Sequence, residues 1–213
     1  MKKNKQENGC RELTLRQTAK YLQKHDNYII LTHASPDGDT LGSAFALYYA
    51  LKEIGKAASV ICPDVIPEKY NYFARQTDHV SRDEATVVAV DVADKRLLGG
   101  LEEEFGDIVD LNIDHHISNV RFAKNLFLDA DAAATAESMY ELLGIMKVNI
   151  NDVTAKALYT GIATDTGCFK YSNVTAKTHM IVAQLYEYNI DAPEINRIMF
   201  DTKSRKLLEL ERM

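Results

Sequence analysis

Hydrophobic and polar positions follow two alternating patterns along the chain. Short, mostly apolar runs, typical of buried parallel strands, fall at residues 28–32, 58–62, 86–90, 108–113 and 125–128. Apolar residues recur at helical spacing over residues 13–25, 40–54, 95–105, 133–143, 153–164, 176–187 and 191–200. This alternation predicts βαβ units. We therefore expect an α/β fold with a doubly wound, mostly parallel β-sheet flanked by helices.

No internal repeat and no linker rich in Gly, Ser or Pro divides the chain. Because 213 residues is about the size of one large domain, we expect a single domain over residues 1–203. Residues 204–213 have a helix-forming composition without a C-terminal capping residue. This pattern is typical of an interrupted helix, and we expect it to continue into a longer parent protein.

The composition is that of a globular protein, with 46% hydrophobic and 26% charged residues. The three cysteines, Cys10, Cys62 and Cys168, form no Cys-x-x-Cys pair, which favours free thiols in a reducing cytoplasm. The basic amino terminus is not followed by an apolar stretch, unlike a secretory signal. No apolar run approaches the roughly 20 residues of a membrane span. We expect a cytoplasmic protein that has no membrane partner.

The charge balance is acidic, with 25 basic and 31 acidic side chains and a formal net charge of −6. A domain that binds duplex DNA normally carries a basic stripe, and none is visible here. We therefore expect no duplex DNA as a partner. Divalent ions held by some of the carboxylates would still leave a positive centre for a phosphate group.

Acidic and histidine residues follow three of the expected strands, in the segments His33–Asp39, Asp91 and Asp114–His116. A further carboxylate, Asp165, follows an apolar helical stretch. The carboxyl ends of parallel strands meet at one edge of a sheet, so these groups should converge there. Crowded carboxylates repel one another unless cations bind, and Asp with His suits Mn²⁺ or Mg²⁺ more than structural zinc. Two such ions are the usual apparatus for hydrolysing phosphate esters.

Simpler interpretations exist for single members of this set. An aspartate after a strand is usually a helix N-cap or a turn residue, and Asp39 or Asp94 could be only that. Adjacent histidines in a loop are more often solvated than ligands. Together, however, an HxxxDxD loop, a strand-terminal Asp and a strand-terminal DHH favour a metal site. The aromatic residues Tyr70, Tyr72 and Phe73 could stack on a base, but they are more typical of a core or of its edge.

Four motifs occur in the order found in a known superfamily. They are THASPDGDTLGS (32–43), VD (90–91), IDHHISN (113–119) and GIATDTG (161–167), and ATAE (134–137) also matches the pattern. On these residues the chain resembles the DHH phosphoesterase superfamily, and most closely its bacterial nanoRNase and pAp phosphatase branch. The resemblance extends from about residue 13 to residue 204.

The resemblance implies a site with two Mn²⁺ ions, with Mg²⁺ as the alternative metal. One ion is implied at His33, Asp37 and Asp91. The other is implied at Asp39, Asp91, His115 and Asp165, so that Asp91 bridges the two. Asp114 is implied to orient the imidazole of His115. His116 is implied to contact the substrate phosphate and to act as a general acid.

The same resemblance implies a Mn²⁺-dependent phosphoesterase. Its substrates would be short oligoribonucleotides, cleaved to 5′-mononucleotides, or 3′-phosphoadenosine 5′-phosphate (pAp), which loses its 3′-phosphate. Cyclic or linear dinucleotides are the alternative substrates, and a homodimer is a possible assembly. Family members carry a second, substrate-binding domain, and residues 204–213 are expected to begin the linker helix towards it. The alternative of another class is a metal- and nucleotide-binding module that lacks catalysis because this domain is missing.

Overall fold

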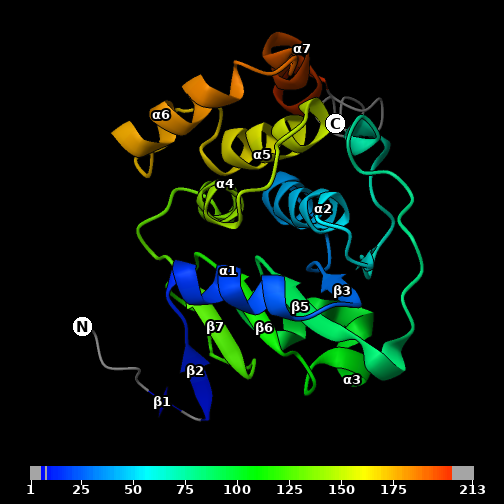
Figure 1. Ribbon diagram of the computed structural model, residues 1–213. Coiled ribbons are helices and arrows are strands. Elements are labelled where there is room, and N and C mark those ends of the chain that lie inside the picture. Colours follow the sequence, from blue (N-terminus) through cyan, green and yellow to red (C-terminus); the bar gives the residue numbers. More distant parts are fainter. Residues whose placement is uncertain (1–5, 8, 203–213) are drawn as a thin grey trace, which may run out of the picture.

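The computed structural model describes residues 6–7 and 9–202. In this part of the chain, seven strands form one sheet in the order β1-β2-β7-β6-β5-β3-β4 (Figure 1). The strands are β1 (Gln6–Glu7), β2 (Cys10–Glu12), β3 (Tyr28–Leu31), β4 (Ala58–Ile61), β5 (Thr86–Val90), β6 (Leu111–Asp114) and β7 (Asn125–Leu128). Along this order, neighbouring strands from β2 through β7, β6, β5 and β3 to β4 are all parallel, whereas β1 pairs antiparallel with β2. The expected mostly parallel sheet is therefore confirmed.

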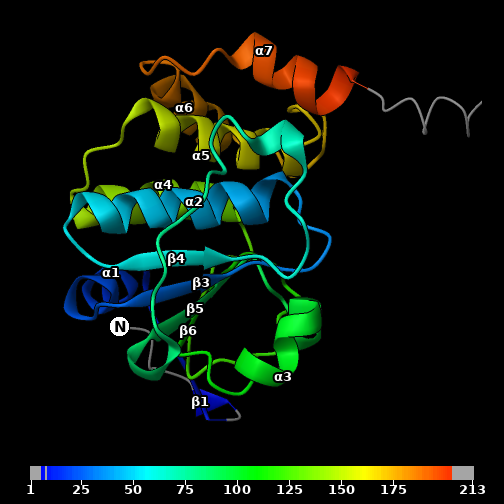
Figure 2. The ribbon, with the colours of Figure 1, turned by 90° about the vertical axis from the view of Figure 1, so that its right-hand side faces the viewer.

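Helices cover both faces of the sheet, which confirms the doubly wound arrangement. They are α1 (Leu15–Lys24), α2 (Gly38–Glu53), α3 (Glu102–Phe105), α4 (Thr135–Met146), α5 (Asp152–Asp165), α6 (Ala176–Leu185) and α7 (Ala192–Asn196). Helices α2 and α4 lie over one face with α5, α6 and α7 stacked beyond them, and α3 lies on the opposite side (Figures 1 and 2). Alternate residues of β3 reach the two cores: Ile30 packs in the larger cluster, and Ile29 and Leu31 in the smaller one beneath.

Local sequence signals explain where α1 begins and where α2 ends. A capping box starts α1: the Thr14 hydroxyl accepts the N–H of Gln17, and the Gln17 side chain accepts the N–H of Thr14. Gly55, with φ of 79°, follows the end of α2 as expected. The N–H of Lys56 donates to the carbonyl of Leu51 across this glycine, which is the Schellman pattern.

The structure differs from the expected elements in several places. The unexpected strand β1 and the π helix (Arg197–Asp201) that follows α7 within the expected helix 191–200 are two of them. The expected helix over 95–105 is divided into a 3₁₀ helix (Lys95–Leu101) and α3, because Gly99 has φ 55° and ψ −125°, which no regular helix contains. Strand β6 begins at Leu111, three residues later than expected. Strand β2 was not expected, because its three residues contain no apolar run.

The expected linker helix over residues 204–213, and the domain boundary before it, lie outside the described residues. None of the helices in the described part has both the length and the apolar character needed to cross a membrane. Cys10, Cys62 and Cys168 are free, as expected.

Two glycines let α5 pack closely against α2 and α4. A Cβ added at Gly42 would lie 2.3 Å from the carbonyl oxygen of Ala157, and one added at Gly161 would lie 2.7 Å from the Cβ of Ala136. No side chain fits in these gaps, so the helices touch at their backbones. This contact brings the carboxyl end of α5 to the amino ends of α2 and α4, where the acidic residues lie.

Candidate metal centre

The loop between β3 and α2 carries two of the expected ligands. Asp37 is the N-cap of α2, and its Oδ1 accepts the N–H groups of Asp39 (3.0 Å) and Thr40 (3.1 Å). The same Oδ1 lies 3.7 Å from Nε2 of His33, so the capping carboxylate also faces the imidazole. The interpretation of an aspartate as a cap thus holds for Asp37 and for Asp94, which caps its 3₁₀ helix, but not for Asp39.

Asp91 follows the end of β5 and lies among three imidazoles, those of His33, His115 and His116. Its backbone is left-handed, with φ of 62°, a conformation that costs a non-glycine residue about 1–3 kcal/mol and is concentrated at functional sites. Oδ2 of Asp91 lies 3.8 Å from Nε2 of His33, and Oδ1 lies 3.8 Å from Nε2 of His115. The carboxylate therefore presents Oδ2 to His33 and Oδ1 to His115, and the same Oδ1 lies 3.6 Å from Nδ1 of His116.

Asp39, in the first turn of α2, is completely buried. Its carboxylate accepts the N–H groups of Thr135 (2.6 Å) and Ala136 (2.9 Å) at the start of α4, and the hydroxyl of Ser43 (3.2 Å). The positive end of the α4 dipole favours a negative charge at this position. Burial nevertheless raises the pKa of Asp39 well above its usual value, and the neighbouring carboxylates raise it further. A bound cation would relieve this repulsion.

Gly161→Ala is expected to disturb this carboxylate, because the added Cβ would lie 2.8 Å from Oδ1 of Asp39. We expect unfolding to cost about 1–3 kcal/mol less. Mn²⁺ affinity should fall by about tenfold or more, since a group that orients a ligand typically contributes that much. The control is Gly144→Ala in α4, where the added Cβ has no neighbour within 4 Å. Calorimetric Mn²⁺ titration of both variants is the measurement, and equal affinities would contradict the assigned packing.

Asp114, at the end of β6, fixes the loop that follows it. Its Oδ1 accepts Nδ1–H of His116 (2.8 Å) and the backbone N–H of His115 (2.8 Å), and its Oδ2 accepts the Asn119 amide (2.6 Å). Burial raises the pKa of Asp114, but these hydrogen bonds outweigh it and hold the pKa below the usual value. The expectation that Asp114 orients the imidazole of His115 was wrong. Nδ1 of His115 instead contacts the carbonyl of Ala132 (3.1 Å), because the ring turns away from β6 towards α4.

This turn aims Nε2 of His115 at three carboxylates. It lies 3.2 Å from Oδ2 of Asp165, 3.8 Å from Oδ1 of Asp91 and 3.9 Å from Oδ2 of Asp39. The atom is buried and has no hydrogen-bond partner among the residues that the structure describes. A buried polar atom without a partner is costly, and a nitrogen that faces carboxylate oxygens is a fitting ligand for a divalent cation. The residues present therefore fit a metal ion.

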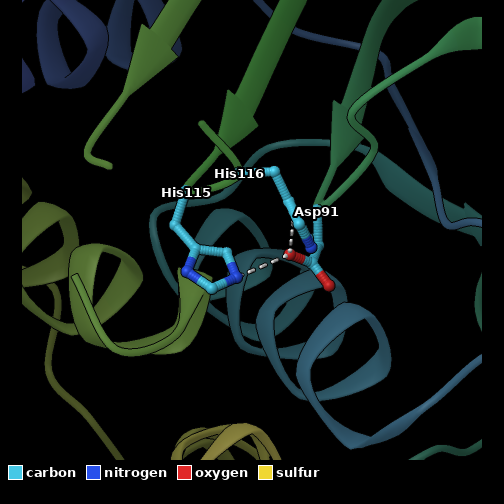
Figure 3. Close-up of side chains that lie close together, drawn as sticks. All are labelled: Asp91, His115 and His116. Atoms are coloured by element: carbon cyan, nitrogen blue, oxygen red, sulfur yellow. Dashed lines mark ion pairs between the residues drawn. The ribbon is translucent and has the colours of Figure 1, made fainter. Parts of the chain in front are cut away.

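Within the described part of the chain, three groups of side chains have ligand atoms close enough to share an ion. They are His33 with Asp37 and Asp91; Asp39 with His115 and Asp165; and Asp91 with His115 and His116 (Figure 3). The structure thus brings together all six residues expected to bind metal, and Asp91 belongs to two of the groups.

The charges of this cluster are strongly coupled. Burial lowers the pKa of both His33 and His115, but the surrounding carboxylates outweigh it and raise the pKa to about 9 and about 10. Burial, followed by the charge of Asp37, raises the pKa of Asp91 to about 6. Without a cation, the cluster therefore balances its negative charge with protonated imidazoles.

Two residues of the cluster had no role in the sequence interpretation. Thr135 and Ala136 belong to the ATAE segment, which was noted only as matching a family pattern. Their contacts to Asp39 depend on how α4 meets α2, and the sequence alone carries no signal for that. The expectation of a core or edge role for the three aromatic residues is confirmed: Tyr70 and Phe73 are 2% and 0% exposed, and the partly buried Tyr72 packs against the same core.

A family model described as "DHH family, N-terminal domain" matches residues 27–162. The chain belongs to the DHH family. The resemblance drawn from the four motifs is thus confirmed. The matched region holds five of the six expected metal ligands, and Asp165 lies just beyond it.

Curated relatives of this DHH chain include two proteins named bifunctional oligoribonuclease and PAP phosphatase NrnA. The Thermus thermophilus protein is 34% identical over 177 residues, which cover 80% of this chain and 53% of that protein. The Bacillus subtilis protein is 27% identical, over 85% of this chain and 59% of that protein. The chain thus spans little more than half the length of these relatives.

A crystal structure of an exopolyphosphatase-related protein from Bacteroides fragilis is similar over most of the DHH chain. The TM-score is 0.82 at 25% sequence identity, over 92% of this chain and 62% of that chain. The likeness supports the doubly wound fold described above.

Proposed function

We propose that this chain is the catalytic part of a Mn²⁺-dependent phosphoesterase. Its substrates are short oligoribonucleotides, which it hydrolyses to 5′-mononucleotides, and pAp, from which it removes the 3′-phosphate. The observation that carries the proposal is the buried Nε2 of His115, which has no partner and faces three carboxylates. Membership of the DHH family and the names of the two NrnA relatives support the substrate class.

The donor set fits two divalent ions. One would be held by His33, Asp37 and Asp91. The other would be held by Asp39, Asp91, His115 and Asp165. Carboxylates and imidazoles without thiolates favour Mn²⁺, with Mg²⁺ as the alternative. Such ions polarise a phosphoryl oxygen and lower the pKa of water, and the protein contributes the fixed positions of the ligands.

His116 is proposed to act on the substrate rather than on the metal. Its Nδ1 donates to Asp114, which leaves Nε2 to donate to a phosphate oxygen, and its side chain is 43% exposed. The hydrogen bond to Asp114 raises the pKa of His116, so the ring keeps a proton that a leaving group can accept. Asp114 thus acts as the residue that holds the ring in its orientation.

His116→Gln is expected to lower kcat by about 100-fold or more, because a general acid contributes roughly 10²–10⁴-fold. Mn²⁺ affinity should change less than about threefold, although His116 lies beside Asp91. The measurements are steady-state hydrolysis of a labelled dinucleotide and Mn²⁺ titration. His79→Gln, at an exposed position, is the control. If His116→Gln loses a bound ion, His116 is a metal ligand and the proposed role is wrong.

A surface hollow beside the site provides room for the nucleoside part of a substrate. Its volume is about 420 Å³, within the range of small-molecule pockets. It is lined by residues that follow Asp91 and His116 in the chain, including two of the 3₁₀ helix Lys95–Leu101, namely Ala93, Asp94, Arg96, Leu97, Ser118 and Val120. Hydrogen bonds from Val120 N–H to the Ala93 carbonyl and from Ala34 N–H to the Leu97 carbonyl tie its walls to the site.

Val120→Trp is expected to fill this hollow, since Val120 is 48% exposed on its wall. We expect KM for a dinucleotide to rise by about tenfold, because a nucleobase and the indole cannot share the space. A small activated phosphodiester should be hydrolysed at the rate of the parent protein. Met180→Trp on α6, at a residue that is 61% exposed, serves as the matched control. Equal KM values for both variants would exclude the hollow as the nucleoside site.

The experiment that tests the proposed function is release of mononucleotides from a labelled dinucleotide in Mn²⁺. pAp, a cyclic dinucleotide, a linear dinucleotide and pyrophosphate form the substrate panel, and a two-domain relative is the positive control. Turnover of dinucleotide or pAp supports the proposal. Binding of Mn²⁺ and nucleotide without turnover would instead support the alternative of a binding module.

A further inference from the structure

Thr135 contacts two of the buried carboxylates at once. It is the first residue of α4 and is completely buried. Its hydroxyl donates to Oδ1 of Asp91 (2.7 Å), and its backbone N–H donates to Oδ2 of Asp39 (2.6 Å). These carboxylates come from different elements, one from the start of α2 and the other from the end of β5. A single residue therefore links a carboxylate of α2 to a carboxylate that follows β5.

The two hydrogen bonds of Thr135 hold carboxylate oxygens that face the imidazole of His115. Oδ1 of Asp91 and Oδ2 of Asp39 both face Nε2 of His115, at 3.8 and 3.9 Å, and only Oδ2 of Asp165 (3.2 Å) lies closer among the three carboxylates. The Thr135 hydroxyl binds the same Oδ1, which keeps Oδ2 of Asp91 directed at His33. Without this donor, we expect the Asp91 carboxylate to turn more easily about its Cβ–Cγ bond, so that its two oxygens are held less firmly towards His33 and His115.

We propose that Thr135 is a positioning residue for the metal centre, setting the rotation of Asp91 and its distance from Asp39. The inference rests on the proposed metal site, but it concerns a residue that ligates no ion itself. Hydrogen-bonding partners of metal ligands typically contribute 10–100-fold to metal affinity. Here one side chain and one backbone group of the same residue serve two ligands, so the hydroxyl can be removed while the N–H remains.

Thr135→Val is the variant that removes only the hydroxyl, because valine has nearly the same shape and keeps the backbone N–H. We expect Mn²⁺ affinity to fall by about 10–100-fold, measured by the spin resonance signal of free Mn²⁺ during titration. Thr135→Ser keeps a hydroxyl and should bind within about threefold of the parent protein. The matched control is Thr18→Val in α1, where an equally buried hydroxyl donates to the carbonyl of Thr14 (3.1 Å), away from the carboxylate cluster.

Unfolding of the metal-free variants separates positioning from a merely structural role. If Thr135 only stabilises the fold, Thr135→Val unfolds more easily but binds Mn²⁺ like the parent protein, and the inference is overturned. If Thr135→Val does not fold, Thr135→Ala avoids crowding by the second methyl group and is compared with Thr18→Ala. Loss of affinity in that variant, with rescue in Thr135→Ser, supports the inference.

These measurements do not depend on turnover. A chain that binds Mn²⁺ but hydrolyses no substrate would refute the proposed function, and the affinity of Thr135→Val would still decide the role of Thr135. Unchanged affinity together with normal hydrolysis would refute the positioning role and leave the proposed function standing.

Discussion

Asp91→Asn is expected to reduce phosphoester hydrolysis by about 10⁴-fold, comparable to the loss of a central catalytic group. Asparagine keeps the size of the side chain but removes the charge, and Asp91 is the residue that faces both His33 and His115. Its amide nitrogen would also place hydrogens where a cation is expected. The loss should therefore affect both halves of the site, rather than the affinity of one ion.

The measurement is kcat/KM on a dinucleotide in saturating Mn²⁺, together with the number of ions bound. Asp107→Asn is a matched control, because the Asp107 side chain is 87% exposed and pairs only with Lys95 among the described residues. If Asp91→Asn keeps activity within tenfold of the parent protein, the assignment of Asp91 as the shared ligand is incorrect.

Removal of metal is expected to lower thermal stability substantially. An ion that binds only the folded chain, at a thousand times its Kd, adds about 4 kcal/mol. In a chain of this length, each kcal/mol corresponds to about 2–4 °C in Tm. Mn²⁺ at saturation should therefore raise Tm by about 8–16 °C per ion over the protein in EDTA.

Thermal unfolding in EDTA, and then in millimolar Mn²⁺, is the measurement. Asp91→Asn should show a smaller increase, whereas Asp107→Asn should follow the parent protein. An unchanged Tm, combined with no metal found by elemental analysis of the purified protein, would contradict a two-ion site. Repeating the series with Mg²⁺ would compare the two candidate metals directly.

Much of the site could be predicted from the sequence because its chemistry coincides with strand ends. Once Tyr28–Leu31, Thr86–Val90 and Leu111–Asp114 are read as parallel strands, the residues that follow them must meet at one edge. Asp165 needed more than this rule, since it ends a helix. Its position depends on the close contact of α5 with α2 at Gly42 and Gly161.

The direction of side chains could not be predicted in the same way. The order Asp114-His115-His116 does not reveal which imidazole pairs with Asp114, because the answer depends on the turn of the chain after β6. In the structure it is His116, and His115 turns to Ala132. The contacts of Thr135 likewise arise only when α4 meets α2. The break at Gly99 depends on one residue with positive φ, and composition does not specify its conformation.

The cluster is assembled from parts of the chain that are far apart, from His33 near the start to Asp165 after the last strand. During synthesis, the group of Asp39, His115 and Asp165 is incomplete until residue 165 has been added and the strands have paired. Ions bound to the complete site therefore stabilise the chain only after it has folded. It should slow unfolding while leaving the rate of refolding nearly unchanged, as interactions absent from the transition state do. In a cell, metal supply would then set how long the folded protein lasts rather than how quickly it forms.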